Sequence, residues 1–234
     1  MKRLVLMVEG SGDVDSATNI TARMLNHLSQ QSAPHLYVNQ VMKVGDVNAL
    51  LSPKQGKDNI KLIRLLRSVE NQSADLGGVL VLIDGDADFV LTTNGRQQFC
   101  PVTIGRYMVD LAVQNTCAGK RYSFAVVFAN REFESWILAG HPDFMTRTVD
   151  DDLEKYPRNA KKKIEEITKQ PYREVLDQIK YTREIDIEYI LKRQPRMRSF
   201  HRFDHALRQI NESVLSNRLI CSPSTCLQTD VETN

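Results

Sequence analysis

Four short runs of apolar residues are the clearest pattern along the chain. Residues 3–8 and 79–83 consist almost wholly of Val, Leu, Ile and Met after the first position. Runs of this length without polar alternation are typical of strands that are buried on both faces, as in a parallel sheet. Residues 36–44 and 123–129 predict two more strands, so we expect a sheet of about four strands.

Stretches with apolar residues at three- and four-residue steps lie between and after these runs, and they predict helices. The expected helices are residues 16–29, 58–69, 104–115, 131–139, 159–169, 172–180, 185–192 and 200–215. Ser16 is the expected N-cap of the first helix, and residues 89–103 are expected to form a loop above the strand ends. Strands that alternate with helices indicate βαβ units, and hence an α/β, Rossmann-like parallel sheet flanked by helices.

The two halves of the chain differ in pattern. We expect a sheet domain over residues 1–149, a basic helical subdomain that extends it over 150–220, and a flexible tail over 221–234. The run Asp150-Asp151-Asp152 marks the expected boundary, and the two halves are expected to share one core.

Composition is that of an ordinary globular protein, with 234 residues of which 41% are hydrophobic and 26% are charged. No apolar stretch approaches the ~20 residues that cross a bilayer, so a cytoplasmic protein with no membrane partner is expected. Cys100, Cys117, Cys221 and Cys226 show no CxxC spacing and are expected to be reduced thiols.

Acidic residues follow two of the apolar runs at the points where the predicted strands end. Glu9 and Asp13 follow the first run, while Asp84, Asp86 and Asp88 follow the third. The carboxyl ends of parallel strands meet at one edge of a sheet, where open α/β folds build sites. Several carboxylates in one crevice repel each other unless a cation offsets their charge, so we expect a hard divalent metal there.

Basic residues gather in the second half, although the net charge is only +2. The closest group is Lys192, Arg193, Arg196, Arg198 and Arg202. A basic patch beside a metal crevice is the electrostatic footprint of a protein that binds nucleic acid. For each residue alone, a solvated position on a helix is the alternative.

The segment from Asp84 to Asp88 permits several chemistries by itself. A calcium loop of the EF-hand type would need Gly and Glu where the chain has Phe89 and Gly95. A haloacid-dehalogenase-like phosphatase would use Asp84 as nucleophile and Asp86 as acid, and this alternative stays open. Asp and Gly after a strand are also ordinary turn formers.

In combination, the motifs resemble the Toprim domain of topoisomerases, primases and overcoming-lysogenization-defect (OLD) nucleases. Its strand-end Glu-Gly and later Asp-x-Asp match Glu9-Gly10 and Asp84 to Asp86. Nearly the whole chain also resembles a Toprim-like subgroup known as a domain of unknown function, through residues 134–139 (Glu-Ser-Trp-Ile-Leu-Ala) and Ser199-Phe200. Gly12 and Asp13 replace the Thr and Glu of its first motif.

This resemblance implies a Toprim-like fold and roles for particular residues. Glu9, Asp84 and Asp86 would hold Mg²⁺ or Mn²⁺, and Lys161 would stabilise the charge of the leaving group. Asp13, Asp88 and Glu134 would complete a second metal site. The subgroup resembles the effector nuclease of the PARIS anti-phage system, which works with an ABC-type ATPase partner.

We therefore expect a metal-dependent endonuclease that hydrolyses phosphodiesters of DNA or structured RNA as an anti-phage defence effector. A homodimer is expected, because two sites suit a duplex or folded substrate. The alternatives are a non-catalytic Toprim-like metal-binding module that acts with an ABC-type ATPase, and the phosphatase that would use Asp84.

Overall fold

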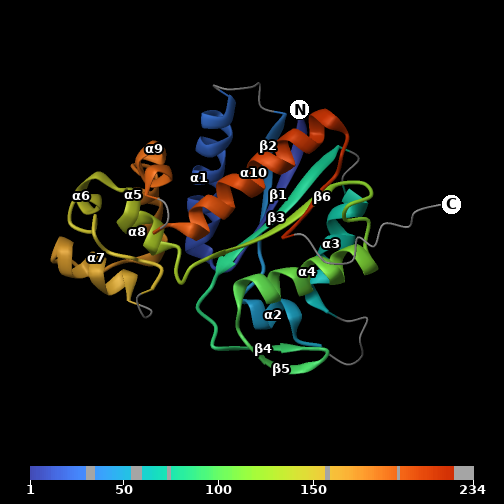
Figure 1. Cartoon of the computed structure of the whole chain (residues 1–234), viewed down its shortest axis with the longest axis horizontal. Coiled ribbons are helices and arrows are strands. Elements are labelled where there is room, and N and C mark those ends of the chain that lie inside the picture. Colours follow the sequence, from blue (N-terminus) through green and yellow to red (C-terminus); the bar gives the residue numbers. More distant parts are fainter. Residues whose placement is uncertain (30–34, 54–59, 73–74, 156–158, 194–195, 224–234) are drawn as a thin grey trace.

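A five-stranded parallel sheet in the order β2-β1-β3-β6-β7 forms the centre of the molecule (Figure 1). The computed structural model describes residues 1–29, 35–53, 60–72, 75–155, 159–193 and 196–223. The strands of the sheet are β1 Lys2–Val8, β2 Leu36–Lys43, β3 Leu76–Asp84, β6 Ser123–Ala129 and β7 Cys221–Ser222. Two further strands, β4 Phe89–Thr92 and β5 Gly95–Gln98, form a separate antiparallel hairpin. The expected α/β, Rossmann-like fold with a parallel sheet is confirmed.

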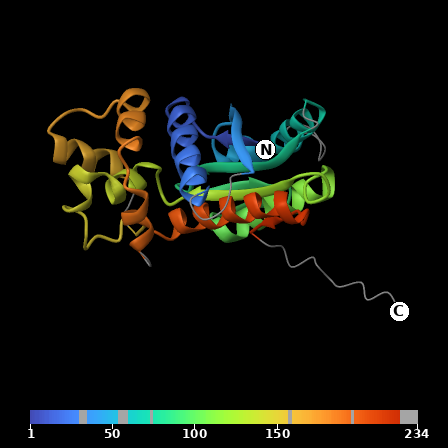
Figure 2. The same cartoon turned by 90° about the horizontal axis from the view of Figure 1, so that it is seen from above.

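Helices flank the sheet and also gather at one end of the molecule. The longer helices are α1 Ser11–Ser29, α3 Lys61–Gln72, α4 Pro101–Asn115 and α10 Arg198–Ser216. The shorter helices are α2 Val47–Leu51, α5 Glu134–Gly140, α6 Pro142–Met145, α7 Ala160–Thr168, α8 Glu174–Thr182 and α9 Ile187–Lys192. Figures 1 and 2 show α5 to α9 grouped at one end, with α10 running from them across the sheet. Within the described ranges, no helix has both the length and the apolar character needed to span a membrane.

Alternate residues of the strands belong to two different hydrophobic cores, because successive side chains of a strand point to opposite faces. Leu4 and Leu6 of β1 pack in the core that contains α1 and α10, whereas Val5 and Met7 pack in the core that contains α2, α3 and α4. The first core also includes Trp136 and other residues of the helical end. The sheet and the helical half therefore share a core, as expected.

The structure corrects several predicted boundaries. Helix α1 begins at Ser11, so Ser16 is a buried residue inside the helix and not its N-cap. Residues 89–103 contain the β4–β5 hairpin and the start of α4, where a loop was expected. Cys221 and Ser222 pair with β6, where a flexible tail was expected. Residues 224–234 of that tail, and the expected helix start at residue 58, lie outside the described residues.

Trp136 of α5 joins the helical end to α10. Its ring lies 5.1 to 5.2 Å from the rings of Phe133, Phe200 and Phe203, measured between centroids. Its Nε1 donates a hydrogen bond to Ser199 Oγ at 2.8 Å. The side chain is fully buried, so both the packing and the hydrogen bond contribute to stability.

Replacing Trp136 by Ala is expected to lower the free energy of unfolding by about 3–5 kcal/mol, because it leaves a large cavity. Trp136→Phe keeps an aromatic ring but removes the hydrogen bond to Ser199 and part of the packing, so its loss is expected to be smaller. Urea unfolding followed by far-ultraviolet circular dichroism measures both, since Trp136 is the one tryptophan of the chain and its fluorescence disappears with it. If both variants lost the same free energy of unfolding, packing of the ring would not be the larger contribution of Trp136 to stability.

Candidate functional site

Carboxylates that lie far apart in the sequence meet at the carboxyl edge of the sheet. Asp84 is the last residue of β3, which lies between β1 and β6. Burial, followed by the negative charges of Glu134, Asp13, Glu9 and Asp86, raises the pKa of Asp84 well above its ordinary value. The structure thus brings these five predicted site residues into one electrostatically coupled group, which we call the carboxylate cluster.

Glu9 lies just after the last residue of β1 and is partly buried. Its Oε2 accepts a hydrogen bond from the backbone N–H of Asp84 at 3.3 Å. Burial and the charge of Asp86 raise the pKa of Glu9 from 4.5 to about 7. Near neutral pH this carboxyl is therefore a mixture of its two forms, and a cation beside it would favour the ionised one.

Backbone hydrogen bonds hold the ends of β3 and β6 together and orient Asp84. The N–H of Gly85 donates to the carbonyls of Ala129 at 2.7 Å and Arg131 at 3.0 Å. The N–H of Phe133 donates to Asp84 Oδ1 at 2.9 Å. The Asp84 carboxylate is therefore fixed against the residues that lead into α5.

Asp13, in the first turn of α1, joins that helix to α8. Its Oδ2 accepts the N–H of Gly10 at 2.7 Å, and its Oδ1 accepts Nε2 of Gln178 at 2.7 Å. Helix α8 approaches so closely that a Cβ on Gly12 would lie 2.4 Å from Gln178 Oε1. A glycine at position 12 therefore allows the two helices to meet beside the cluster.

Glu134, the first residue of α5, is only 1% exposed and faces Lys161 of α7. Lys161 Nζ lies 3.8 Å from Glu134 Oε1 and 3.2 Å from Glu174 Oε2. Burial raises the pKa of Glu134 to about 7, although Lys161 opposes this. Burial disfavours the charge on Lys161, but the carboxylates of Glu134 and Glu174 outweigh it and raise the pKa of Lys161. Lys161 is therefore protonated at neutral pH.

Glu9, Asp84 and Asp86 of the cluster line a pocket of about 450 Å³. The described residues that line it are Glu9, Asp46, Val47, Asn48, Asp84, Asp86, Ala87, Asp88, Phe89 and Arg96. Asp88, the sixth predicted carboxylate, is exposed and lies at this pocket, as does Asp46, which the sequence analysis did not select. Arg96 and Phe89 come from the β4–β5 hairpin.

The donor chemistry of the cluster fits a hard divalent cation, because carboxylate oxygens are the ligands that Mg²⁺ and Mn²⁺ prefer. Glu134 Oε1 is also buried and accepts no hydrogen bond from the residues that the structure describes. Across those same residues, no three or more His, Cys, Asp or Glu side chains already form a group that could hold a metal ion. A bound ion would therefore have to draw the carboxylates closer together.

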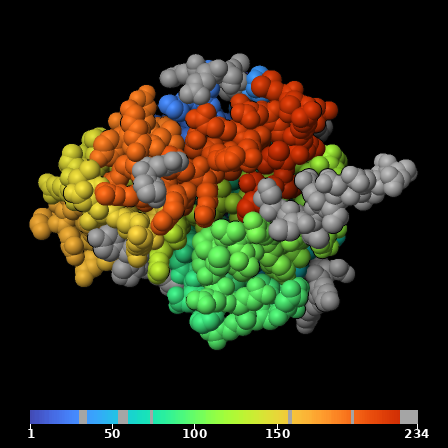
Figure 3. Space-filling view, in the orientation of Figure 1, coloured from blue at the N-terminus to red at the C-terminus, as the bar shows by residue number. Residues whose placement is uncertain are grey.

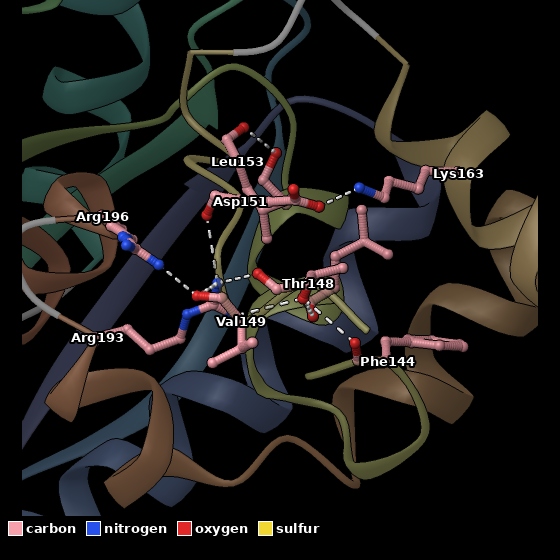
Figure 4. Close-up of polar contacts among 10 residues, drawn as sticks. Phe144, Thr148, Val149, Asp151, Leu153, Lys163, Arg193 and Arg196 are labelled. Carbon is pink, nitrogen blue, oxygen red and sulfur yellow. Dashed lines mark hydrogen bonds and ion pairs between the residues drawn. The ribbon is translucent and has the colours of Figure 1, made fainter. Parts of the chain in front are cut away.

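The five predicted nucleic-acid-binding residues are not all at the surface. Arg193 is buried, and its guanidinium donates to the carbonyls of Ala139, Thr148, Val149 and Asp151 (Figure 4). Arg193 therefore holds the segment after α6 in place and presents no surface to a phosphate.

The other four basic residues have different neighbours. Arg196 donates to the carbonyl of Val149, and Arg198 Nε lies 3.2 Å from Oε2 of the buried Glu154. Lys192 Nζ lies 3.6 Å from Glu188 Oε2 on the exposed side of α9. Arg202 lines a different pocket, of about 640 Å³, beside β6 and the start of α4.

Sequence reasoning missed the residues that α8 and the segment before it contribute. Besides Glu174 and Gln178, Tyr172 lies here, and burial with the charge of Glu134 raises its pKa. Gln178 meets Asp13 across 165 positions of the chain, and no local pattern in the sequence marks such a pair. The one available signal is Gly12, since glycine marks places where another group approaches the backbone closely.

The chain matches the model of a protein family described as "Domain of unknown function (DUF4276)". The match covers residues 8–203, which is most of the 234-residue chain. It includes every residue of the carboxylate cluster and Lys161. Searches of the curated proteins and of the solved structures found no match.

Without added divalent metal, we expect thermal stability to fall as the pH rises between about 4.5 and 7, the ordinary and folded-state pKa of Glu9. Because the folded state binds the proton of Glu9 more tightly, stability is greatest below this window and is lost through it. Solvent screening of this partly exposed group reduces the effect to about 1 kcal/mol, or roughly 2–4 °C.

The matched variants are Glu9→Gln and Glu212→Gln, and the measurement is the thermal midpoint at pH 5.5 and pH 8. Glu9→Gln should make the dependence less steep, with the remainder due to Glu134 and Asp84, while Glu212→Gln, at an exposed residue of α10, should leave it unchanged. A dependence that is the same in Glu9→Gln and wild type would show that Glu9 does not contribute.

Proposed function

The chain belongs to the family described as a domain of unknown function (DUF4276), and we propose from its own residues that it is a metal-dependent endonuclease. Its substrate in this proposal is a phosphodiester of DNA or structured RNA. The observation that carries the proposal is the protonated Lys161 beside the carboxylate cluster. Hydrolysis of a phosphodiester needs positive charge near the transferring phosphorus, and the cluster together with a metal and Lys161 would supply it.

Glu9, Asp84 and Asp86 would hold Mg²⁺ or Mn²⁺, and Asp13, Asp88 and Glu134 are the carboxylates proposed for a second ion. When bound, such an ion would neutralise and polarise the phosphodiester and lower the pKa of an attacking water. The raised pKa values of Glu9 and Asp84 support this assignment, because burial and neighbouring negative charges raise them, and a bound cation would favour the ionised carboxylates.

The chain's own groups orient the site in this proposal. The N–H of Phe133 holds the Asp84 carboxylate, and Gln178 holds Asp13. Lys161, kept charged by Glu134 and Glu174, would stabilise the negative charge that develops on the leaving oxygen.

The likeness of the motifs to Toprim nucleases supports a proposal about the biological role and partner of the chain. In that proposal the chain is a homodimeric anti-phage effector that works with an ABC-type ATPase. The same likeness allows a non-catalytic metal-binding partner of such an ATPase, and the strand-end position of Asp84 allows a phosphatase. Cleavage and phosphatase assays of the wild type and an Asp84 variant distinguish these three functions.

Asp84→Asn is expected to slow cleavage by at least about 10²-fold, because it removes a negative charge that would bind the metal. Wild type and variant are compared on plasmid DNA, single-stranded DNA and transfer RNA with Mg²⁺ or Mn²⁺. Asp143→Asn, on the exposed side of α6, is the matched control and should cleave at the wild-type rate. Thermal midpoints show that the variants fold.

Unchanged cleavage by Asp84→Asn would remove the proposed site. Absence of cleavage by wild type, with and without an ABC-type ATPase, would contradict the nuclease and favour the non-catalytic module. Asp84-dependent hydrolysis of a small phosphomonoester, with an aspartyl-phosphate trapped on the protein, would favour the phosphatase.

Lys161→Gln is expected to lower kcat by about 10²-fold, because an ammonium that stabilises developing charge is lost. The neighbouring Lys162 is exposed and provides the matched control Lys162→Gln, which should retain kcat. Multiple-turnover cleavage with saturating substrate measures kcat for both variants. An equal, small effect of the two substitutions would mean that Lys161 acts only through the general charge of α7.

A further inference from the structure

One face of the β4–β5 hairpin is turned to solvent. Phe89 pairs with Gln98, and Leu91 pairs with Arg96, so these four side chains lie on the same face of the hairpin. All four residues are exposed, and the exposed fractions of the apolar pair are high, 46% for Phe89 and 48% for Leu91. Figure 3 shows the hairpin region at the lower margin of the molecule, in teal to green.

The opposite face anchors the hairpin to the body of the protein. Val90 is fully buried in the core that contains α2, α3 and α4. Asn48 of α2 bonds the backbone of β4 in both directions, with Nδ2 donating to Phe89 O at 3.1 Å and Oδ1 accepting from Leu91 N at 2.9 Å. Because these contacts hold the backbone, the exposed face is pre-organised and loses little freedom when it binds a ligand.

The hairpin also adds an aromatic ring and a positive charge to the acidic pocket. Arg96 and Phe89 line this pocket together with Glu9, Asp84 and Asp86, and Arg96 is the basic residue among the described lining residues. The guanidinium carbon of Arg96 lies 4.0 Å from the centre of the Phe89 ring. A guanidinium that lies over a ring keeps its N–H donors in its own plane, where they can bind a phosphate.

An aromatic ring beside an arginine is the combination with which proteins hold single-stranded nucleic acid, since bases stack on the ring and the cation binds the backbone. A duplex keeps its bases stacked inside and offers no base to Phe89. The acidic residues of the pocket repel a polyanion, so a cation at its rim is needed for a phosphodiester to approach them.

We propose that the β4–β5 hairpin binds single-stranded nucleic acid, with Arg96 holding a backbone phosphate and Phe89 stacking on a neighbouring base. The inference rests on the proposed function, because it assigns the contacts that bring a phosphodiester to the carboxylate cluster. It also names the substrate form that the site accepts, which is an unpaired strand.

The test is the affinity of the full chain for fluorescently labelled single-stranded DNA and RNA, measured by anisotropy in EDTA so that no cleavage occurs. Phe89→Leu and Arg96→Gln should each weaken binding by about fivefold or more, whereas Phe89→Tyr keeps an aromatic face and should bind like wild type. Arg96→Gln should also reduce the slope of log affinity against log salt concentration by about 0.7.

The residues for the matched controls lie at the amino ends of strands of the central sheet, whereas the carboxylate cluster lies at the carboxyl ends. Tyr37, an exposed aromatic residue of β2, gives Tyr37→Leu, and Arg121, an exposed residue before β6, gives Arg121→Gln. Both should bind like wild type, and thermal midpoints confirm folding. The proposal would be overturned if Phe89→Leu and Arg96→Gln bound with wild-type affinity. It would also be overturned if the control variants lost as much affinity, or if the wild-type protein did not bind.

Cleavage is measured separately, so the two proposals can fail independently. Loss of binding in the hairpin variants of a protein that cleaves no substrate would support the hairpin and contradict the nuclease. Cleavage by a protein whose hairpin variants bind like wild type would contradict the hairpin and leave the nuclease in place.

Discussion

Repulsion among carboxylates that the fold holds together is the constraint on which the rest of this structure depends. Glu9 follows β1 and Asp84 is the last residue of β3, and these two strands are parallel neighbours, so both residues lie at one edge of the sheet. Asp84 is held by the N–H of Phe133, and Glu134 is buried, so neither can turn into solvent to reduce the repulsion. Burial, and then this repulsion, raise the pKa values of Glu9 and Asp84, so the site binds a proton more tightly. The ammonium of Lys161 offsets part of the negative charge.

The helical end of the molecule follows from the same constraint. Lys161 of α7 reaches Glu134, and Gln178 of α8 reaches Asp13, so two helices that are late in the sequence complete a site that begins at residue 9. Gly12 makes this possible, because a side chain there would collide with α8. The strand ends alone would position Glu9 and Asp84 but would lack Lys161 and Gln178, which contact the other carboxylates of the cluster.

Sequence patterns predicted those features of the fold that depend on neighbouring or regularly spaced residues. Residues 79–83 lie in β3, whose side chains are buried on both faces, so no polar residue interrupts the run and the strand could be recognised. Parallel pairing then places Glu9 and Asp84 at one edge, which is a consequence of topology and needs no knowledge of side-chain contacts. The selection of Lys161 came from the resemblance to a known family, and the structure places it beside the cluster.

Other features depend on tertiary contacts that no local pattern reveals. The sequence predicted that Arg193 is an exposed cation. It is buried, because backbone carbonyls of α5 and of the segment after α6 accept hydrogen bonds from its guanidinium. The β4–β5 hairpin is short, and the amide of Asn48, distant in sequence, takes the place of a neighbouring strand. The expected start of α1 was late, because its first turn is rich in glycine, serine and aspartate and resembles a turn.

Glu134 and Trp136 lie two positions apart in one short helix, and they serve different parts of the molecule. The indole of Trp136 is packed among the phenylalanines of α10, while the carboxylate of Glu134 faces Lys161. The position of that carboxylate is thus determined by how well an aromatic core is filled. Substitutions of Phe200 or Phe203 that the fold tolerates are therefore expected to change how α5 packs, and with it the position of the Glu134 carboxylate. Sequence changes in α10 are therefore a route by which the electrostatics of the sheet edge can be adjusted while every charged residue is retained.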